Sequence, residues 1–528
     1  MIVNKYLLIV FSFFLFLPPL FSANITYTIS NVTKPFPMVK IEMNCPACEI
    51  GDYSEFVLKS NFSALRDLEK EVHGLEAFGK NGRKLLVLRG GHRGARTKKD
   101  SWSIGKTQKG ERLLVSYYLV PTRPNISWPT RKRLVLTKSL LHFLGNSVLL
   151  RPIHLDGSCL HSITVKWQGF KESGWQVASS FSSAQDKFTV KRKLDDFLLS
   201  SFMAGPLRIV EESVDGHTVC CAIPGTRWKF KDEDLLYCAL NILQSARTFF
   251  KEKDRQRLFI GLIPIPTKKP MPSGSAGLGL TSSILLYLNP GESLQWLPAK
   301  GKELKHVIAH EIMHKWFGGT IKAQSPTGYV IWFLEGFADF YARRLLRNCG
   351  EITDKQFIAA INQVMDEYLH SPVRELNNHN LLRNYNRRSD VRRLPYLRGA
   401  LIAAHLDDEI RSFWKGKKTL DTFMFHLLAT SRKHLQRRFS NEDLFKTIGE
   451  FTNKEVVKRM RRYIVNGDLL PLPPKNMEGE LKYEIEHVYS PPLARLLRIK
   501  TAEEGGHGKG KDPRKRLEAF VPLLHLRQ

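Results

Sequence analysis

Residues 306–319 read HVIAHEIMHKWFGG and place three histidines, His306, His310 and His314, at intervals of four. Residues four apart lie above one another on one face of an α-helix, so this stretch predicts a helix with a histidine-rich face. His310 and His314 can each offer a ring nitrogen to one zinc ion. His306 and His314 are separated by two turns, or about 12 Å of helix rise, so both cannot bind the same ion. We therefore expect His306 to be a packed or surface histidine.

A catalytic zinc ion needs a third protein ligand, and residues 332–342, WFLEGFADFYA, supply a candidate. Glu335 is a lone carboxylate among apolar side chains and completes a ligand set with His310 and His314. Asp339 follows one helical turn later and is placed to accept a hydrogen bond from the far nitrogen of His310. Glu311, next to a ligand, is the candidate general base that activates water. The alternative is an ordinary core helix that carries histidines.

HExxH followed by EGFA resembles the gluzincin metallopeptidases, and the two segments together are close to the aminopeptidase N and leukotriene hydrolase pattern. Further on, LPYLRGALIAAHLDDEIRSFW is similar to the glycyl aminopeptidase family. The resemblance covers residues 232–470 and implies a peptidase with one zinc ion per chain and a peptide or protein substrate. It also implies that Tyr396 donates a hydrogen bond to the oxyanion of the tetrahedral intermediate, which suits a neutral phenol.

The fold that this resemblance implies is α+β. It consists of an N-terminal β-sandwich-like domain, a thermolysin-like zinc catalytic domain and a C-terminal helical lobe. Short β-rich runs separated by turns between residues 25 and 177 favour the first of these, and helical periodicity from 302 to 463 favours the last. The predicted divisions are 1–23 signal peptide, 24–185 β-rich domain, 186–345 catalytic domain, 346–470 helical lobe, and 471–528 linker and basic tail.

Three features depart from the families that the chain resembles. The twenty residues between His314 and Glu335 form a longer connection than in the aminopeptidase N pattern. The residues after Leu470 are too few and too polar for the PDZ-like domain of glycyl aminopeptidases. Gly277, Leu278 and Gly279 are expected to bind substrate, but they stand where relatives carry a glutamate that holds the substrate's free amine. Whether the enzyme acts as an aminopeptidase or an endopeptidase therefore stays open.

The first 23 residues carry Lys5, then an apolar run, then the small pair Ser22 and Ala23, which is typical of a secretory signal peptide. We therefore expect a secreted or periplasmic protein. The apolar run is shorter than the ~20 residues that a membrane-spanning helix needs, so cleavage is favoured over a retained anchor. We expect no transmembrane anchor after cleavage, since no later stretch is long and apolar enough.

The seven cysteines are an odd number, so disulfide formation would leave at least one thiol over. Cys45 and Cys48 form a lone CxxC, which favours a local disulfide or a turn at a strand end over a metal site.

The formal net charge of +30 would concentrate the protein at anionic surfaces and favour acidic substrates. The alternative is that the lysine and arginine side chains lie on solvent-exposed helix faces and have no specific partner. No zinc-finger, RRM or KH signature accompanies the charge, so no specific nucleic-acid partner is predicted. The alternative to a peptidase is a non-catalytic surface-binding protein in which the zinc site is structural or decayed. Hydrolysis of a non-peptide substrate such as an epoxide has no support in the sequence.

Overall fold

The computed structural model describes most of the chain from Ala23 to Pro471 and two later strands. The signal peptide predicted over residues 1–23 lies outside the described residues except for Ala23. Among the described residues, no helix combines the length and the apolar character that crossing a membrane requires. The described ranges are 23–33, 37–48, 53–58, 67–90, 100–108, 110–122, 132–225, 228–254, 257–265, 275–280, 282–289, 291–295, 303–471, 483–490 and 494–501.

The fold is α+β, as predicted, and the chain divides into two compact units. The first unit comprises Met1–Arg227, Gln256–Lys268 and Leu280–Pro290, and it is built from strands. The second comprises Trp228–Arg255, Lys269–Gly279 and Gly291–Gln528, and it is mainly helical. Each unit is made of three separate stretches of the chain. The five consecutive domains predicted from the sequence therefore stay a prediction.

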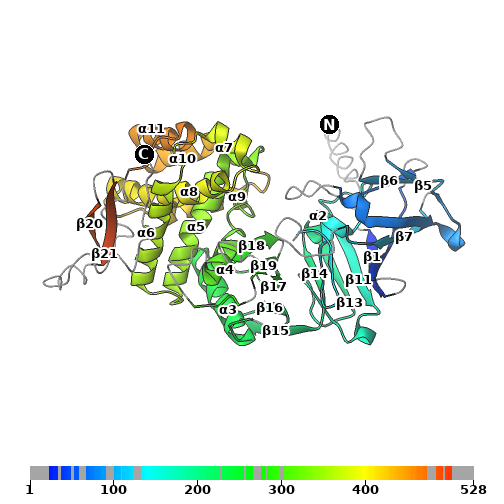
Figure 1. Ribbon diagram of the computed structural model, residues 1–528. Helices are drawn as coiled ribbons and strands as arrows, with labels where there is room; N and C mark the ends of the chain where they lie inside the picture. The colour runs from blue at the N-terminus through cyan, green and yellow to red at the C-terminus, as the bar shows by residue number, and fades with distance from the viewer. Residues whose placement is uncertain are drawn as a thin grey trace, which may run out of the picture. The chain divides into compact units, whose positions relative to one another are not determined.

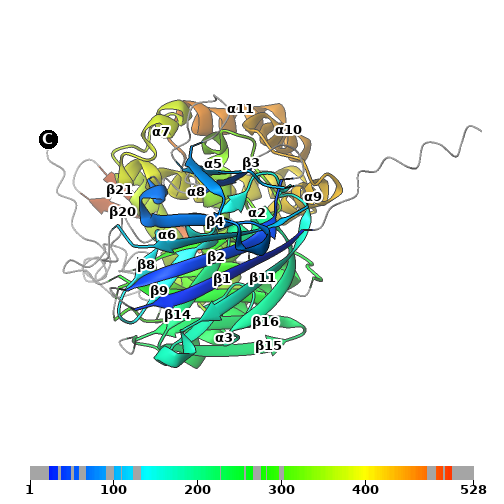
Figure 2. The ribbon, with the colours of Figure 1, turned by 90° about the vertical axis from the view of Figure 1, so that its right-hand side faces the viewer.

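The strands of the first unit form four sets of hydrogen-bonded neighbours, in the orders β13-β11-β1-β2-β7-β4, β10-β3-β6-β5, β12-β14-β9-β8 and β15-β16-β17-β19. Figure 2 shows β1, β2 and β11 side by side. The strands are β1 (Asn24–Val32), β2 (Met38–Pro46), β3 (Tyr53–Val57), β4 (Val72–Phe78), β5 (Leu86–Arg89), β6 (Ser101–Gly105), β7 (Arg112–Leu119), β8 (Val135–Leu136), β9 (Leu141–Leu144), β10 (Arg151–Pro152), β11 (Leu160–Gln168), β12 (Gln176–Ser179), β13 (Lys187–Lys193), β14 (Ser201–Gly205), β15 (Leu207–Val214), β16 (His217–Pro224), β17 (Arg257–Pro264) and β19 (Ser283–Leu288), with short helices α1 (Gly145–Val148) and α2 (Leu194–Leu198).

Alternation of apolar and polar residues explains the strands of the largest sheet. In β1, Ile25, Tyr27 and Ile29 are buried and the residues between them are not. β11 runs parallel to β1, and Ile163 and Val165 lie opposite Ile25 and Tyr27 in the register. A period of two places these side chains on one face, where they join one apolar core.

The strands β16, β17 and β19 are different, because they are apolar almost throughout and run parallel to one another. Parallel strands are usually covered on both faces, which removes the need for polar alternation.

The second unit carries the predicted helical region, which begins at Leu304 and continues through eight helices to Arg461 (Figure 1). Its elements are α3 (Asp232–Phe249), β18 (Ser275–Leu280), α4 (Leu304–Met313), α5 (Ile331–Asn348), α6 (Asp354–His370), α7 (Asn378–Asn384), α8 (Ser389–Phe413), α9 (Leu420–Lys433), α10 (Asn441–Phe451), α11 (Lys454–Arg461), β20 (Tyr483–Ser490) and β21 (Ala494–Thr501).

Two expectations need correction or refinement. β20 and β21 pair as an antiparallel hairpin within residues 471–528, where the sequence predicted only a linker and a basic tail. Cys45 lies at the end of β2 as a buried thiol whose pKa burial raises to about 12. Cys45 therefore lies at the end of a strand but not in the predicted turn, and no disulfide joins Cys45 to Cys48 in this structure.

Helices α5 and α8 approach each other at two glycines. A Cβ atom at Gly399 would lie 2.0 Å from the carbonyl oxygen of Trp332, and a Cβ at Gly336 would lie 2.2 Å from the Cα of Gly399. Both distances are far below van der Waals contact and involve backbone atoms, which cannot turn away as a side chain can. Glycine at both positions is therefore what allows the two backbones to meet.

We predict that Gly399→Ala lowers the free energy of unfolding by about 3 kcal/mol, because the added methyl group overpacks a backbone contact. In an unconstrained helix interior, the same change stabilises by up to about 1 kcal/mol. Gly449→Ala in α10 is the matched control, since a Cβ there meets only the Val457 side chain at 3.3 Å. Urea unfolding monitored by circular dichroism measures both, and equal stability of the Gly399 variant and the wild type would contradict the packing argument.

Candidate metal centre

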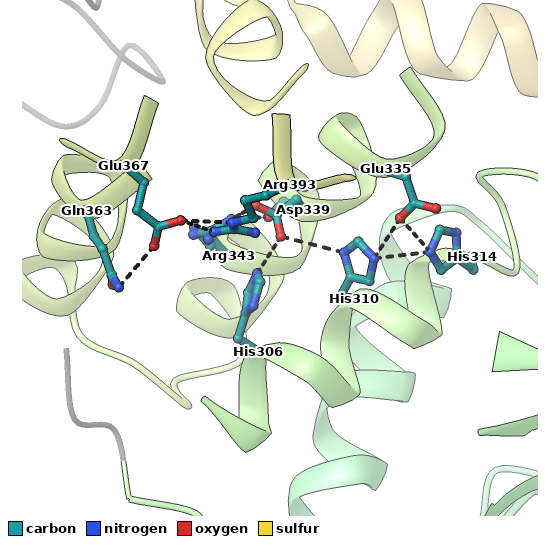
Figure 3. Close-up of polar contacts among 9 residues, drawn as sticks. All are labelled: His306, His310, His314, Glu335, Asp339, Arg343, Gln363, Glu367 and Arg393. Carbon is teal, nitrogen blue, oxygen red and sulfur yellow. Dashed lines mark hydrogen bonds and ion pairs between the residues drawn. The ribbon is translucent and has the colours of Figure 1, made fainter. Parts of the chain in front are cut away.

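Three side chains from two helices converge on one point (Figure 3). His310 lies near the end of α4, His314 is the residue that caps this helix, and Glu335 lies in the first turns of α5. The Nε2 atoms of the two histidines are 3.1 Å apart. Glu335 Oε2 lies 3.2 Å from Nε2 of His310 and 3.4 Å from Nε2 of His314. Two imidazoles and a carboxylate on one centre are a donor set that suits Zn²⁺.

The electrostatics of these groups also fit a cation. Burial opposes charge on Glu335, but the two imidazoles outweigh it and hold the pKa of its carboxyl well below the usual range. Burial likewise opposes charge on His314, yet Glu335 chiefly raises the pKa of this imidazole to about 9. The protein thus stabilises positive charge at the point where the three ligand atoms meet, as a metal site must.

Neighbouring groups fix the direction in which each histidine faces. Nδ1 of His314 lies 3.1 Å from the carbonyl oxygen of Phe317, which leaves Nε2 directed at the centre. Nδ1 of His310 faces Asp339, whose Oδ1 is 3.7 Å away. The predicted pairing of Asp339 with His310 is therefore present as proximity, at a distance longer than a hydrogen bond.

Asp339 has closer partners than His310. Its Oδ1 lies 3.2 Å from Nε2 of His306, and its Oδ2 accepts a hydrogen bond from Nη1 of Arg343. His306 is buried and contributes nothing to the group of candidate ligands, in agreement with the helix-rise argument. The sequence interpretation missed Arg343, although its position four residues after Asp339 on one helix was a usable signal.

Glu311 lies against the strand β18. Its Oε2 accepts a 2.6 Å hydrogen bond from the backbone N–H of Gly279. A Cβ atom at Gly277 would lie 2.2 Å from Cγ of Glu311 and 2.5 Å from its Oε1. Leu278 lies between the two glycines and is half-buried. Gly277 and Gly279 thus let the strand backbone approach the carboxylate, which sequence reasoning did not foresee.

Tyr396 on α8 lies beside the ligands. Its ring centroid is 5.5 Å from that of His310, with the two planes 30° apart. Burial, then the Glu335 carboxylate, raise the pKa of its phenol well above the ordinary value. Tyr385 follows α7 and lies near Tyr396, and burial and the Glu335 carboxylate raise the pKa of the Tyr385 phenol too. No sequence pattern pointed to Tyr385.

Part of the chain that contains these residues matches a known protein family. Residues 275–463 match the family model described as the peptidase family M1 domain. This stretch contains β18, both histidines, Glu311, Glu335 and Tyr396.

Three solved structures share the fold. An aminopeptidase N family protein from Idiomarina loihiensis superposes with a TM-score of 0.67 and 17% identity, over 85% of this chain and 77% of that one. An M1 zinc metallopeptidase from Deinococcus radiodurans gives 0.50 and 16%, over 86% and 95%. Native yeast LTA4 hydrolase gives 0.51 and 13%, over 86% and 69%.

We predict that the purified protein binds about one zinc ion per chain and that His314→Ala lowers this occupancy sharply, because two remaining ligands hold zinc weakly. His370→Ala is the matched control, since His370 is exposed at the end of α6. Elemental analysis after dialysis measures the zinc content. Full occupancy in the His314 variant would exclude this residue as a ligand.

Proposed function

We propose that residues 275–463, which match the peptidase family M1 domain, form a zinc metallopeptidase domain that hydrolyses peptide bonds with Glu311 as general base and Tyr396 as oxyanion donor. The observation that carries the proposal is the convergence of His310, His314 and Glu335 within hydrogen-bond distance of one another, beside these two residues. A structural or decayed zinc site in a surface-binding protein would require neither a carboxylate outside the ligand set nor a phenol beside the ligands.

His310, His314 and Glu335 would hold the metal. A zinc ion bound by these residues supplies Lewis acidity, which makes water more acidic and polarises a carbonyl group. Zinc with three protein ligands keeps a position open for substrate or water, as catalytic zinc sites do.

Glu311 is suited to moving the protons. The N–H of Gly279 occupies its Oε2, so Oε1 is the oxygen that takes a proton from the attacking water. The same oxygen then gives the proton to the leaving nitrogen, and the carboxylate is restored. The hydrogen bond to a fixed strand backbone keeps this carboxylate in one orientation, which lowers the cost of reaching the reactive geometry.

Tyr396 is suited to binding the oxyanion. Because burial and Glu335 raise the pKa of its phenol, the group keeps its proton at neutral pH and can donate it in a hydrogen bond. A donor already held in place stabilises the charge that develops on the former carbonyl oxygen without reorganisation.

Glu311→Gln tests the general base. The amide is nearly isosteric and Glu311 is not a ligand, so we expect zinc content to stay at the wild-type level while kcat falls by at least ~10²-fold. Glu375→Gln is the control, because Glu375 is exposed and its ion-pair partner among the described residues is its neighbour Arg374 at 3.6 Å. Hydrolysis of a fluorogenic peptide gives kcat. Wild-type turnover in the Glu311 variant would mean that another group activates water.

We further propose that a free substrate amine is not required. Residues 277–280, which we align with the segment where relatives carry the amine-binding glutamate, read Gly-Leu-Gly-Leu and contain no carboxylate. A Cβ at Gly279 would lie 3.1 Å from Oε2 of Glu311, so even a small side chain at this position is crowded by the carboxylate of the proposed general base. A buried ammonium without an anion costs several kcal/mol. Backbone groups of β18 can instead pair with an extended peptide that continues beyond the scissile bond.

A matched peptide pair tests this specificity. One peptide has a free N-terminus, its twin is acetylated, and mass spectrometry follows both digests. We expect cleavage of both at internal bonds, with initial rates within about tenfold, since neither terminus is recognised. The Glu311→Gln variant serves as the control for contaminating peptidases. Stepwise trimming of the free peptide alone would show that another anion binds the amine.

We further propose that the enzyme is secreted or periplasmic, on the basis of its first 23 residues. Residues 1–23 have the composition of a secretory signal peptide, which supports a secreted or periplasmic enzyme. N-terminal sequencing of the mature protein checks this, since retention of Met1 would contradict it.

A further inference from the structure

His306 is a buried histidine that the proposed chemistry leaves without a role. It lies on α4, one helical turn before His310, and only 3% of its surface is exposed. Its ring centroid is 6.2 Å from that of His310, so the two imidazoles do not touch. Both face Asp339, which lies on α5 and is completely buried (Figure 3).

The carboxylate of Asp339 divides its oxygens between two helices. Oδ2 accepts from Arg343, which lies on α5 as well and also donates to the backbone carbonyl of Asp339 at 2.8 Å. Oδ1 faces α4, with Nε2 of His306 at 3.2 Å and Nδ1 of His310 at 3.7 Å, and neither contact has the geometry of a hydrogen bond in this structure. The contact with Arg343 is therefore local to one helix, whereas the contact with His306 joins the two helices that carry the zinc ligands.

The charges around Asp339 are balanced without His306. Burial favours the neutral acid, but chiefly Arg343 holds the pKa of Asp339 well below its usual range, so the group is a carboxylate. Arg393, also near Asp339, has its own partner in Glu367, with contacts of 2.8 and 2.7 Å. Burial and then Arg343 lower the pKa of His306 to about 4. A neutral imidazole offers one N–H and adds no charge that would repel a metal.

We propose that His306 is a positioning residue for the metal centre: its Nε2–H holds Oδ1 of Asp339 toward α4, so that the carboxylate faces Nδ1 of His310 and keeps Nε2 of His310 directed at the metal. The inference rests on the proposed zinc site and deepens it. Groups that orient a metal-bound histidine typically change metal affinity by 10- to 100-fold when removed. His306 would not contact the metal-bound histidine itself but would act on His310 through Asp339.

Two substitutions separate the effect of the N–H group of His306 from the effect of its side-chain volume. His306→Gln keeps an N–H donor close to the position of Nε2, whereas His306→Leu keeps bulk and removes the donor. We expect the zinc dissociation constant, from competition with a chromophoric chelator, to rise about tenfold in the Leu variant. In the Gln variant it should stay within about threefold of wild type. Equal affinities for the Leu variant and the wild type, or equal losses in both variants, would overturn the proposal.

A double-variant cycle tests whether the effect passes through Asp339. In an Asp339→Asn background, His306→Leu should weaken zinc binding no further, since the group that it positions is gone. If the two substitutions raised the zinc dissociation constant independently, so that the factor for the double variant equalled the product of the two single factors, the proposal would be overturned. If the wild-type protein bound no zinc at all, the proposed function itself would fail, so the two failures are distinguishable.

A measurement on the wild-type protein covers the case in which His306→Leu does not fold. Histidine ¹⁵N chemical shifts report which ring nitrogen carries the proton, with the signal of His306 assigned by its loss in the Gln variant. We expect the Nε2–H tautomer with and without zinc, because Nε2 faces the carboxylate. A proton on Nδ1 would overturn the proposal, since Nε2 would then be an acceptor facing an acceptor.

Discussion

The close approach of α5 and α8 at Gly336 and Gly399 is the constraint on which the site depends. Neither glycine has room for a methyl group against the opposing backbone. Glu335 directly precedes one glycine, and Tyr396 lies three residues before the other. The backbone contact therefore sets the distance between a zinc ligand and the candidate oxyanion donor. Close packing of this kind fixes positions more firmly than long side chains can, because backbone atoms have no rotamers to change.

Buried charge is the second organising feature. Glu335 and Asp339 are four residues apart on α5, and each faces imidazoles of α4. Removing a carboxylate from water is costly unless partners replace the lost hydration. For Glu335 the partners are the two candidate ligands, while Asp339 has Arg343 and His306. The same two helices are thus joined twice, once at the metal centre and once one turn away, and the second junction supports the geometry of the first.

Glycine also shapes the substrate side of the site. β18 approaches Glu311 so closely that its backbone, and not a side chain, provides the contact. The N–H of Gly279 thereby orients the carboxylate of Glu311, and residues 277–280 carry no anionic side chain. A single residue type thus links the position of the proposed general base to the specificity that we propose, because a Cβ atom at Gly279 would lie only 3.1 Å from Oε2 of Glu311.

The sequence by itself determined the parts that depend on helical periodicity or on a recognisable motif. The spacing of His310 and His314, and the exclusion of His306 as a ligand, follow from the rise of one helix. The α+β class and the helical region also follow from residue pattern and family resemblance. The tertiary structure decided what distant segments do to one another: the role of His306 against Asp339, the meeting of Gly336 and Gly399, and the contact of Gly279 with Glu311. These contacts join residues from 32 to 63 positions apart, and no local pattern encodes such distances. They exist only once packing has brought the helices and the strand together.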